Sequence, residues 1–149
     1  MIDRGSGSKY CPLNQTIYFD MLQLEQIQEL TDVPGLGTLL YVLSHEAGHD
    51  VQMQLGITLT GALSVEVELE ADCMAGAFLR SMVDADEITE EEFLNLINVA
   101  LFIGDPEGVR ATDEGSHGLG SQRVTMLLCG YYNGVDTCGT FDDMLAPAR

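Results

Sequence analysis

The segment His45-Glu46-Ala47-Gly48-His49 combines residue types that can hold and use a metal ion. On a helix, residues four apart lie on the same face, so the imidazoles of His45 and His49 can bind one cation. Glu46 then lies beside the open coordination position, where a carboxylate can act as a general base. This motif indicates the ligand geometry of a zinc hydrolase, with two histidine ligands and Glu46 as the catalytic base.

A catalytic zinc site needs a third protein ligand and keeps its fourth position for water. The stretch of residues 65–73 begins sixteen residues after the first motif ends and has the pattern of a second helix. We favour Glu68 as the third ligand, because Asp72 lies one turn later and can accept the free ring N–H of a ligating histidine. Glu66 and Glu70 are competitors that the spacing does not exclude.

The two motifs and their surroundings resemble the bacterial neutral zinc metallopeptidases, a family of the gluzincin group of zincins. The resemblance runs from Tyr10 to Phe141, and its most specific parts are the H-E-x-x-H and E-x-x-A-D elements. In the family, the glutamate of E-x-x-A-D is the third zinc ligand, which implies this role for Glu68. The other matching positions are Tyr10-Cys11-Pro12, Ile17-Tyr18-Phe19-Asp20, Ser44, Val51-Gln52, Cys73, Ala75-Gly76, Ile103-Gly104-Asp105, His117-Gly118, Gln122-Arg123, Cys138 and Thr140-Phe141.

The sequence departs from the family at three places. Asp50 stands where a further histidine is usual, the segment between Asp105 and His117 is shortened, and Leu119-Gly120 replaces a serine pair. None of these changes removes a proposed ligand or the proposed base. The shortened loop bears on substrate preference, because loops around a site usually shape it.

The resemblance also implies roles for two later residues. In similar gluzincins a histidine at the start of a late helix faces the zinc, and His117 lies in the matching element. A donor there can stabilise the oxyanion that forms on the attacked carbonyl, which makes His117 a catalytic candidate. The alternative is a solvent-facing or capping histidine in a glycine-rich loop. Arg123 is expected to anchor this loop by pairing with a carboxylate, and with Asp72 it would support the ligands.

Charge and composition limit the class of protein. The chain has 149 residues, 46% of them hydrophobic, which is enough for one domain with its own core. The formal net charge is -18, from 6 Lys plus Arg against 24 Asp plus Glu, so neither nucleic acid nor an anionic membrane surface is expected as a partner. We interpret the acidic excess as a solvated surface rather than a dedicated site for basic substrates, and expect a peptide or protein substrate.

The 4 cysteines are even in number and lack the C-x-x-C spacing of a structural zinc site, which favours disulfides. One set of pairs joins Cys129 to Cys138 and Cys11 to Cys73, and a bridge from Cys11 to Cys138 stays open. Oxidised cysteines predict an extracytoplasmic protein, secreted or membrane-anchored. The alternative is a cytoplasmic protein with four reduced, buried thiols.

Neither a signal peptide nor a membrane span is visible in the sequence. Residues 1–8 lack an apolar stretch, and no run of eighteen apolar residues could cross a bilayer. Proteins similar to this chain often carry a hydrophobic anchor near the N-terminus. The resemblance therefore implies that such an anchor can precede the domain in a full-length protein.

The elements that must position these residues follow from hydrophobic periods and chain-breaking residues. Short extended segments at residues 10–11 and 16–19 flank Pro12-Leu13-Asn14-Gln15, which predicts a hairpin or a bent pair of strands. Helical periods and caps, such as the capping box of Thr89 and Glu92, predict the helices. These helices cover residues 21–30, about 37–55, about 61–83 and 89–103.

Packing predictions concern the two motif helices. The apolar face of the first is expected to comprise Leu39, Leu40, Val42 and Leu43. Small residues keep part of the second narrow, namely Ala71, Ala75, Gly76 and Ala77. Two helices can then approach closely, as the metal requires, because Glu68 must reach an ion held on the first helix. Gly48, on the first motif helix, can also allow this close approach.

The extended segment of residues 10–20 also suggests how a substrate binds. In similar gluzincins a strand before the motif helix borders the cleft, and a peptide can add to such an edge through main-chain hydrogen bonds. This mode predicts broad tolerance of substrate sequence. The alternative is a hairpin that only covers the core.

These features predict an α+β, mostly helical fold of the zincin-like metallopeptidase type, with a short N-terminal β-hairpin or edge strand and a helical core. Residues 10–142 form the catalytic domain, after a flexible lead at 1–9 and before a tail at 143–149. The predicted function is a zinc-dependent endopeptidase with one Zn2+ ion and a water activated by Glu46. The alternative is a non-catalytic or latent zinc-binding interaction domain, which needs the ligands but no base.

Overall fold

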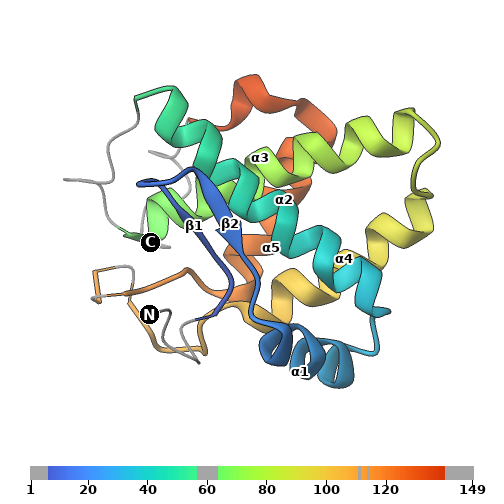
Figure 1. The fold of residues 1–149 in the computed structure, drawn as a ribbon, viewed down its shortest axis with the longest axis horizontal. Coiled ribbons are helices and arrows are strands. Elements are labelled where there is room, and N and C mark those ends of the chain that lie inside the picture. Colours follow the sequence, from blue (N-terminus) through green and yellow to red (C-terminus); the bar gives the residue numbers. More distant parts are fainter. Residues whose placement is uncertain (1–6, 57–63, 111, 114, 140–149) are drawn as a thin grey trace, which may run out of the picture.

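The fold is known from a computed structural model, which describes residues 7–56, 64–110, 112–113 and 115–139 (Figure 1). The first six residues of the predicted lead, the predicted tail, and residues 61–63 of the second motif helix lie outside the described residues. The elements are β1 (Lys9–Cys11), β2 (Thr16–Tyr18), α1 (Met21–Thr31), α2 (Gly35–Gln54), α3 (Ser64–Asp84), α4 (Glu90–Ile103), α5 (Gly120–Asn133) and the 3-10 helix η1 (Val135–Thr137). The predicted fold class, α+β and mostly helical with an N-terminal hairpin, is confirmed.

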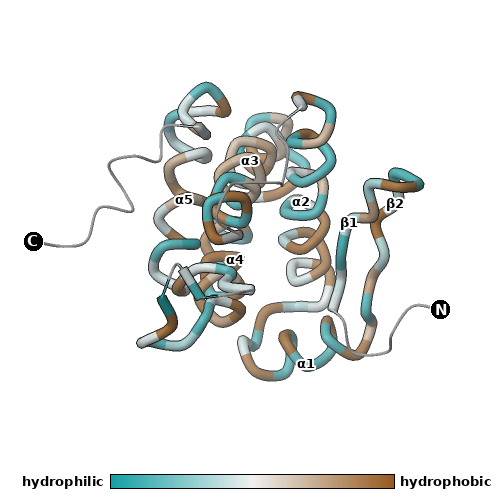
Figure 2. The backbone as a smooth tube through the Cα atoms, turned by 90° about the vertical axis from the view of Figure 1, so that its left-hand side faces the viewer, coloured by the Kyte–Doolittle hydropathy of each residue, from teal (hydrophilic) through white to brown (hydrophobic). Residues whose placement is uncertain are grey.

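The hairpin lies along one side of α2. Its strands are antiparallel, with Tyr10 opposite Ile17, and Gln15 in the connecting turn has a φ of 52°. Figure 2 shows β1 beside α2 and β2 on the outside. The hairpin therefore stands next to the first motif helix, as the resemblance to similar gluzincins implies.

Capping side chains fix the beginnings of two helices. Asp20 accepts hydrogen bonds from the backbone N–H groups of Leu22 and Gln23 at the start of α1. Thr89 and Glu92 form the predicted capping box of α4, with Glu92 N donating to Thr89 Oγ1 at 3.1 Å and Thr89 N donating to Glu92 Oε2 at 2.7 Å. These local signals explain why the predicted helix starts agree closely with the structure.

The buried face of α2 differs from the predicted one. Leu43 is 37% exposed, whereas Tyr41 is 0% and Val42 6% exposed. The buried positions of α2 follow a helical period through Thr38, Tyr41 and His45, so Leu43 falls on the outer side. The prediction that Leu43 belongs to the core is wrong, because it was based on apolar residue types and did not establish which side of the helix faces the core.

Glycines let α3 contact α5 through the backbone. A Cβ atom at Gly76 would lie 1.9 Å from the carbonyl oxygen of Leu127, and one at Gly130 would lie 1.8 Å from that of Cys73. Toward α2, a Cβ at Gly48 would lie 2.9 Å from the carbonyl oxygen of Ala71. The narrow surface of α3 is therefore real, but Gly76 serves the contact with α5 rather than the contact with the first motif helix.

One disulfide joins Cys73 of α3 to Cys138 after η1, across 65 residues of sequence. Cys11 and Cys129 are free thiols in the structure. A disulfide was predicted, but neither proposed arrangement forms. Cys11 lies in β1 on the α2 side of the molecule, whereas Cys138 packs against Cys73 in a cluster with Leu69 and other apolar residues.

Within the described parts of the chain, no helix has the length and apolar composition that a membrane span would require.

Candidate metal centre

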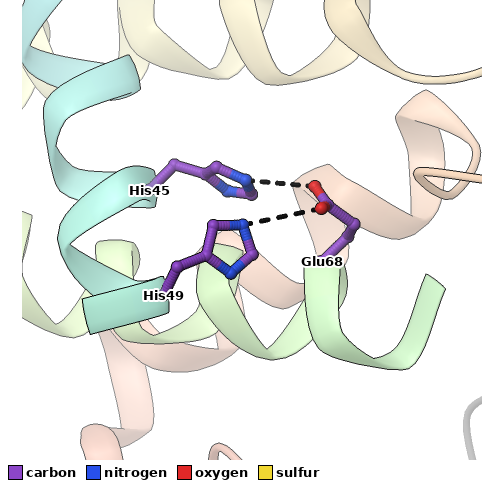
Figure 3. Close-up of side chains that lie close together, drawn as sticks. All are labelled: His45, His49 and Glu68. Carbon is purple, nitrogen blue, oxygen red and sulfur yellow. Dashed lines mark hydrogen bonds and ion pairs between the residues drawn. The ribbon is translucent and has the colours of Figure 1, made fainter. Parts of the chain in front are cut away.

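Two helices bring the three predicted ligands together (Figure 3). His45 and His49 project from α2, and Glu68 projects from α3 with its carboxylate facing the two imidazole rings. His45 Nε2 lies 3.1 Å from Glu68 Oε2, and His49 Nε2 lies 3.5 Å from Glu68 Oε1. Among the described residues, these three side chains form a group whose ligand atoms all lie within 4.8 Å of one another. The competitors Glu66 and Glu70 are not in this group.

The spacing of these atoms suits a zinc ion. With metal–ligand distances of about 2.0–2.1 Å, two ligands of a tetrahedral zinc ion lie roughly 3.4 Å apart. The two nitrogen–oxygen distances to Glu68, 3.1 and 3.5 Å, lie on either side of that value. Two imidazoles and one carboxylate are also the ligand set of several catalytic zinc sites. The residues present therefore fit a zinc ion.

A buried network around Asp72 orients His45. Asp72 Oδ1 accepts hydrogen bonds from Tyr41 Oη at 2.6 Å and from His45 Nδ1 at 2.9 Å. Arg123 of α5 binds the same carboxylate in a bidentate manner, with Nε 2.8 Å from Oδ2 and Nη2 3.1 Å from Oδ1. Because the Nδ1–H of His45 points to Asp72, the Nε2 atom faces Glu68.

Electrostatic contacts keep the carboxylates of Asp72 and Glu68 ionised. Burial alone would lower the pKa of His45, but the charge and hydrogen bond of Asp72 outweigh burial and raise it to about 9. Burial raises the pKa of Asp72, yet the charges of Arg123 and His45 outweigh it and lower it to about 2. Burial likewise acts on Glu68, whose pKa the three histidines nevertheless hold well below its usual range. Two anionic groups thus flank the imidazoles, an arrangement that favours a bound cation.

The hairpin holds the proposed base. The backbone N–H of Tyr10 donates to Glu46 Oε2 at 2.6 Å. The phenol of Tyr10 also hydrogen-bonds Asp50, which raises the pKa of Tyr10 to about 12. Glu46 is 7% exposed, and burial raises its pKa although the nearby charges of His45 and His49 oppose this. Tyr10 therefore anchors β1 to α2 at two points on either side of the second histidine.

The loop before α5 brings His117 to the edge of the site. His117 Nδ1 lies 3.4 Å from Glu68 Oε2, while its side chain is 58% exposed. Asp105 Oδ2 organises the loop by accepting hydrogen bonds from His117 N at 2.7 Å, Gly118 N at 3.1 Å and Ser116 Oγ at 3.0 Å. A hydrogen bond to Glu68 raises the pKa of His117. His117 thus faces the ligand cluster and the solvent at the same time.

A cavity of about 580 Å³ opens onto these residues. Its polar wall includes the three proposed ligands, Glu46 and His117, and its apolar wall includes Ile27, Val42 and Ile103. Lys9 and Tyr10 of β1 also line the cavity. The cavity therefore borders both the polar cluster and the hairpin.

Sequence reasoning missed the partners that complete the site. Tyr41 lies four residues before His45, so the same rule that paired the histidines could have placed it on their face. Gln52 could have been found in the same way, because it lies three residues after His49. The backbone contact from Tyr10 and the loop contacts of Asp105 depend on tertiary structure, and no spacing in the sequence indicates them.

Comparison with known proteins identifies one matching family and several related proteins. The sequence profile of a family described as "Putative neutral zinc metallopeptidase" matches residues 3–141. The uncharacterized protein YpfJ of Escherichia coli is 30% identical over 155 residues, which cover 91% of this chain and 54% of that protein. An uncharacterized protein of Mycobacterium tuberculosis is 29% identical over 161 residues, which cover 91% and 55%.

The chain spans about half the length of the curated relatives that it matches. Their names state neither an activity nor a substrate. No solved structure gives a significant match to the chain.

Proposed function

The chain belongs to the neutral zinc metallopeptidase family, and from this membership we propose that it is a zinc-dependent endopeptidase. The observation that carries the proposal is the convergence of His45, His49 and Glu68, with Glu46 beside them at the wall of an open cavity. A site that served structure alone would need ligands but no base, and it would usually close its fourth position with another side chain.

His45, His49 and Glu68 would hold one zinc ion. When bound, zinc polarises the scissile carbonyl and makes water a better nucleophile at neutral pH. Asp72 keeps the Nδ1–H of His45 directed away from the ion, supported by Tyr41, and would thereby strengthen His45 as a ligand.

Glu46 is the proposed general base. Its carboxylate accepts a proton from the attacking water and then passes that proton to the nitrogen of the leaving amine. Before a substrate binds, the hydrogen bond from Tyr10 N to Oε2 holds this carboxylate at the cavity wall. His117 would donate a hydrogen bond to the oxyanion from the loop side of the cavity.

We propose that a peptide substrate lies along the edge of β1 that faces the cavity. Two backbone donors are directed away from β2 at this edge: Ser8 N, which binds Gln23 Oε1 at 2.8 Å, and Tyr10 N, which binds Glu46 Oε2 at 2.6 Å. A peptide that adds to this edge has to take these donors from the two side chains. Recognition through the backbone predicts broad sequence tolerance, so sharp specificity for a single cleavage site in a peptide library would contradict this mode.

We also propose an extracytoplasmic location for the domain. The Cys73–Cys138 disulfide supports it, because such bonds persist mainly in oxidising compartments. Alkylation of thiols in intact cells followed by mass spectrometry would test it. Finding Cys73 and Cys138 reduced in the cell would contradict the location.

Cleavage of a peptide library by the zinc-loaded protein tests the proposed activity. We expect one zinc ion per chain, cleavage products detectable by mass spectrometry, loss of cleavage after a chelator and recovery after zinc is returned. Stoichiometric zinc without any cleavage would instead favour the alternative, a zinc-binding interaction domain on the same scaffold. A chain that binds no zinc would contradict both functions.

A further inference from the structure

Gln52 of α2 connects the second histidine to α3. Its side chain is 0% exposed. The amide nitrogen donates to the backbone carbonyl of Val67 at 2.9 Å and to Glu70 Oε2 at 2.7 Å. The amide oxygen lies 2.8 Å from His49 Nδ1. All three contacts are within hydrogen-bond distance, so this buried amide has a partner on each side.

The contacts on α3 fix which way the amide faces. Its nitrogen carries two N–H groups, and the Val67 carbonyl and the Glu70 carboxylate supply one acceptor for each. In a flipped amide, the side-chain oxygen would face the Val67 carbonyl oxygen and a Glu70 carboxylate oxygen. None of these three oxygens could then donate a hydrogen bond to another. The oxygen of Gln52 must therefore face His49.

This orientation decides which ring nitrogen of His49 carries the proton. An amide oxygen only accepts, so His49 Nδ1 has to carry the proton that the contact needs. The Nε2 atom, which faces Glu68 Oε1 at 3.5 Å, is then the nitrogen that is free to bind a metal.

We propose that Gln52 is a positioning residue of the metal centre, which selects the metal-binding tautomer of His49 and sets its place relative to Glu68. The second effect follows from Val67, because its carbonyl belongs to the residue next to Glu68. One amide thus ties a ligand on α2 to the backbone beside the ligand on α3. The inference rests on the proposed metal site and is independent of peptide hydrolysis.

The two histidines are held by different chemistry. His45 donates to the carboxylate of Asp72, which Arg123 neutralises, whereas His49 donates to a neutral amide. Loss of Gln52 therefore removes an acceptor without leaving the unpaired buried cation that loss of Asp72 would leave. Loss of Gln52 also removes the donor of the Val67 carbonyl and of the buried Glu70 carboxylate, so stability has to be measured beside zinc affinity.

The experiment measures zinc affinity and stability in parallel. Gln52→Met keeps the size of the side chain but removes the acceptor, and we expect zinc affinity to fall about 10–100-fold. Gln54→Met is the matched control on the same helix, since Gln54 is exposed and its amide donates to Asp50 Oδ2 at 2.7 Å, and it should leave zinc affinity unchanged. Val99→Ala, a core change in α4, should lower stability without changing the zinc affinity of the folded protein.

A paired exchange provides the rescue. Gln52→Glu keeps an acceptor for His49 but faces the Glu70 carboxylate, so Glu70→Gln is combined with it to supply a donor. The double variant should recover most of the zinc affinity that Gln52→Met loses, which a purely structural role does not predict.

A measurement on the unchanged protein avoids any failure of the variants to fold. In zinc-loaded protein, the ¹⁵N shifts of the His49 ring should show a protonated Nδ1 and a metal-bound Nε2. A metal-bound Nδ1, or equal zinc affinity in wild type and Gln52→Met, would overturn the role of Gln52 while leaving the proposed function intact. Wild-type protein that binds no zinc would overturn both.

Discussion

The two long faces of α3 are built in different ways. Figure 2 shows α5, α3, α2 and the hairpin in that order across the molecule. Toward α5 the contact is made by backbone against backbone at Gly76 and Gly130, and a disulfide lies nearby. Toward α2 the contact is polar, with Glu68 and Asp72 reaching imidazoles and a phenol. The face toward α5 is the more closely packed, and the face toward α2 carries most of the polar contacts, while Arg123 of α5 also binds Asp72.

This difference shows how the chain can keep a costly site in place. Buried charges contribute little net stability, because their desolvation offsets much of their attraction. Where α3 faces α2, the nitrogen and oxygen atoms of the ligands also have to point at one common position. This arrangement differs from the pairing that would give the highest stability. The close α3–α5 contact supplies a rigid support, so that Glu68 has a defined position when α2 presents the histidines.

The largest expected effect belongs to the polar face and changes activity alone. Glu46→Gln should lower kcat by about 10²–10⁴-fold, because an amide cannot accept the proton of the attacking water. The amide oxygen can still accept the hydrogen bond from Tyr10 N, so the hairpin contact is kept. Zinc content and the thermal midpoint should match those of the wild type, as metal analysis and circular dichroism would show. Near wild-type turnover would remove Glu46 from the proposed role.

The next effect belongs to the closely packed face and changes stability alone. Replacing Cys73 and Cys138 by alanine opens a link across 65 residues, which costs about 4 kcal/mol of unfolding free energy in the chain-entropy model. Urea denaturation would measure this loss, with Cys129→Ala as the control for a thiol that forms no bridge. The folded double variant should bind zinc as the wild type does. A strong loss of zinc affinity would show that the two faces are not separate.

The sequence predicts the polar face better than the packed one. The ligands and Asp72 follow helical spacing, and the capping box of Thr89 and Glu92 is a local signal, so both are visible in the linear chain. The disulfide and the partner of Gly76 depend on how α5 returns across α3, which no local period encodes. Tyr41 was accessible from spacing, but an aromatic residue before a motif is ordinarily read as core, and its hydroxyl contact with Asp72 appears only in three dimensions.

A single methyl group tests the packed face directly. Gly76→Ala places a Cβ against the Leu127 carbonyl, a backbone atom that can move only if α3 and α5 separate. Overpacking of this kind costs about 3 kcal/mol, and the gain of about 1 kcal/mol from the better helix former offsets only part of it. We expect a net loss of about 2 kcal/mol in the unfolding free energy, measured by urea denaturation. Unchanged stability would mean that this contact is looser than the structure shows.

The same change on the other face should have the smallest effect on stability and a clearer one on the metal. In Gly48→Ala the new Cβ would lie 2.9 Å from the carbonyl oxygen of Ala71, so a shift of a few tenths of an ångström relieves it. The helix gain of about 1 kcal/mol roughly balances that cost, and the unfolding free energy should stay within about 1 kcal/mol of the wild type. The shift moves His49 relative to Glu68, however, and uses most of the roughly 0.5 Å within which a functional site has to be held, so zinc affinity should fall by about tenfold. If Gly48→Ala instead destabilises the fold as much as Gly76→Ala and leaves zinc binding unchanged, then both faces of α3 serve packing and the contrast between them fails.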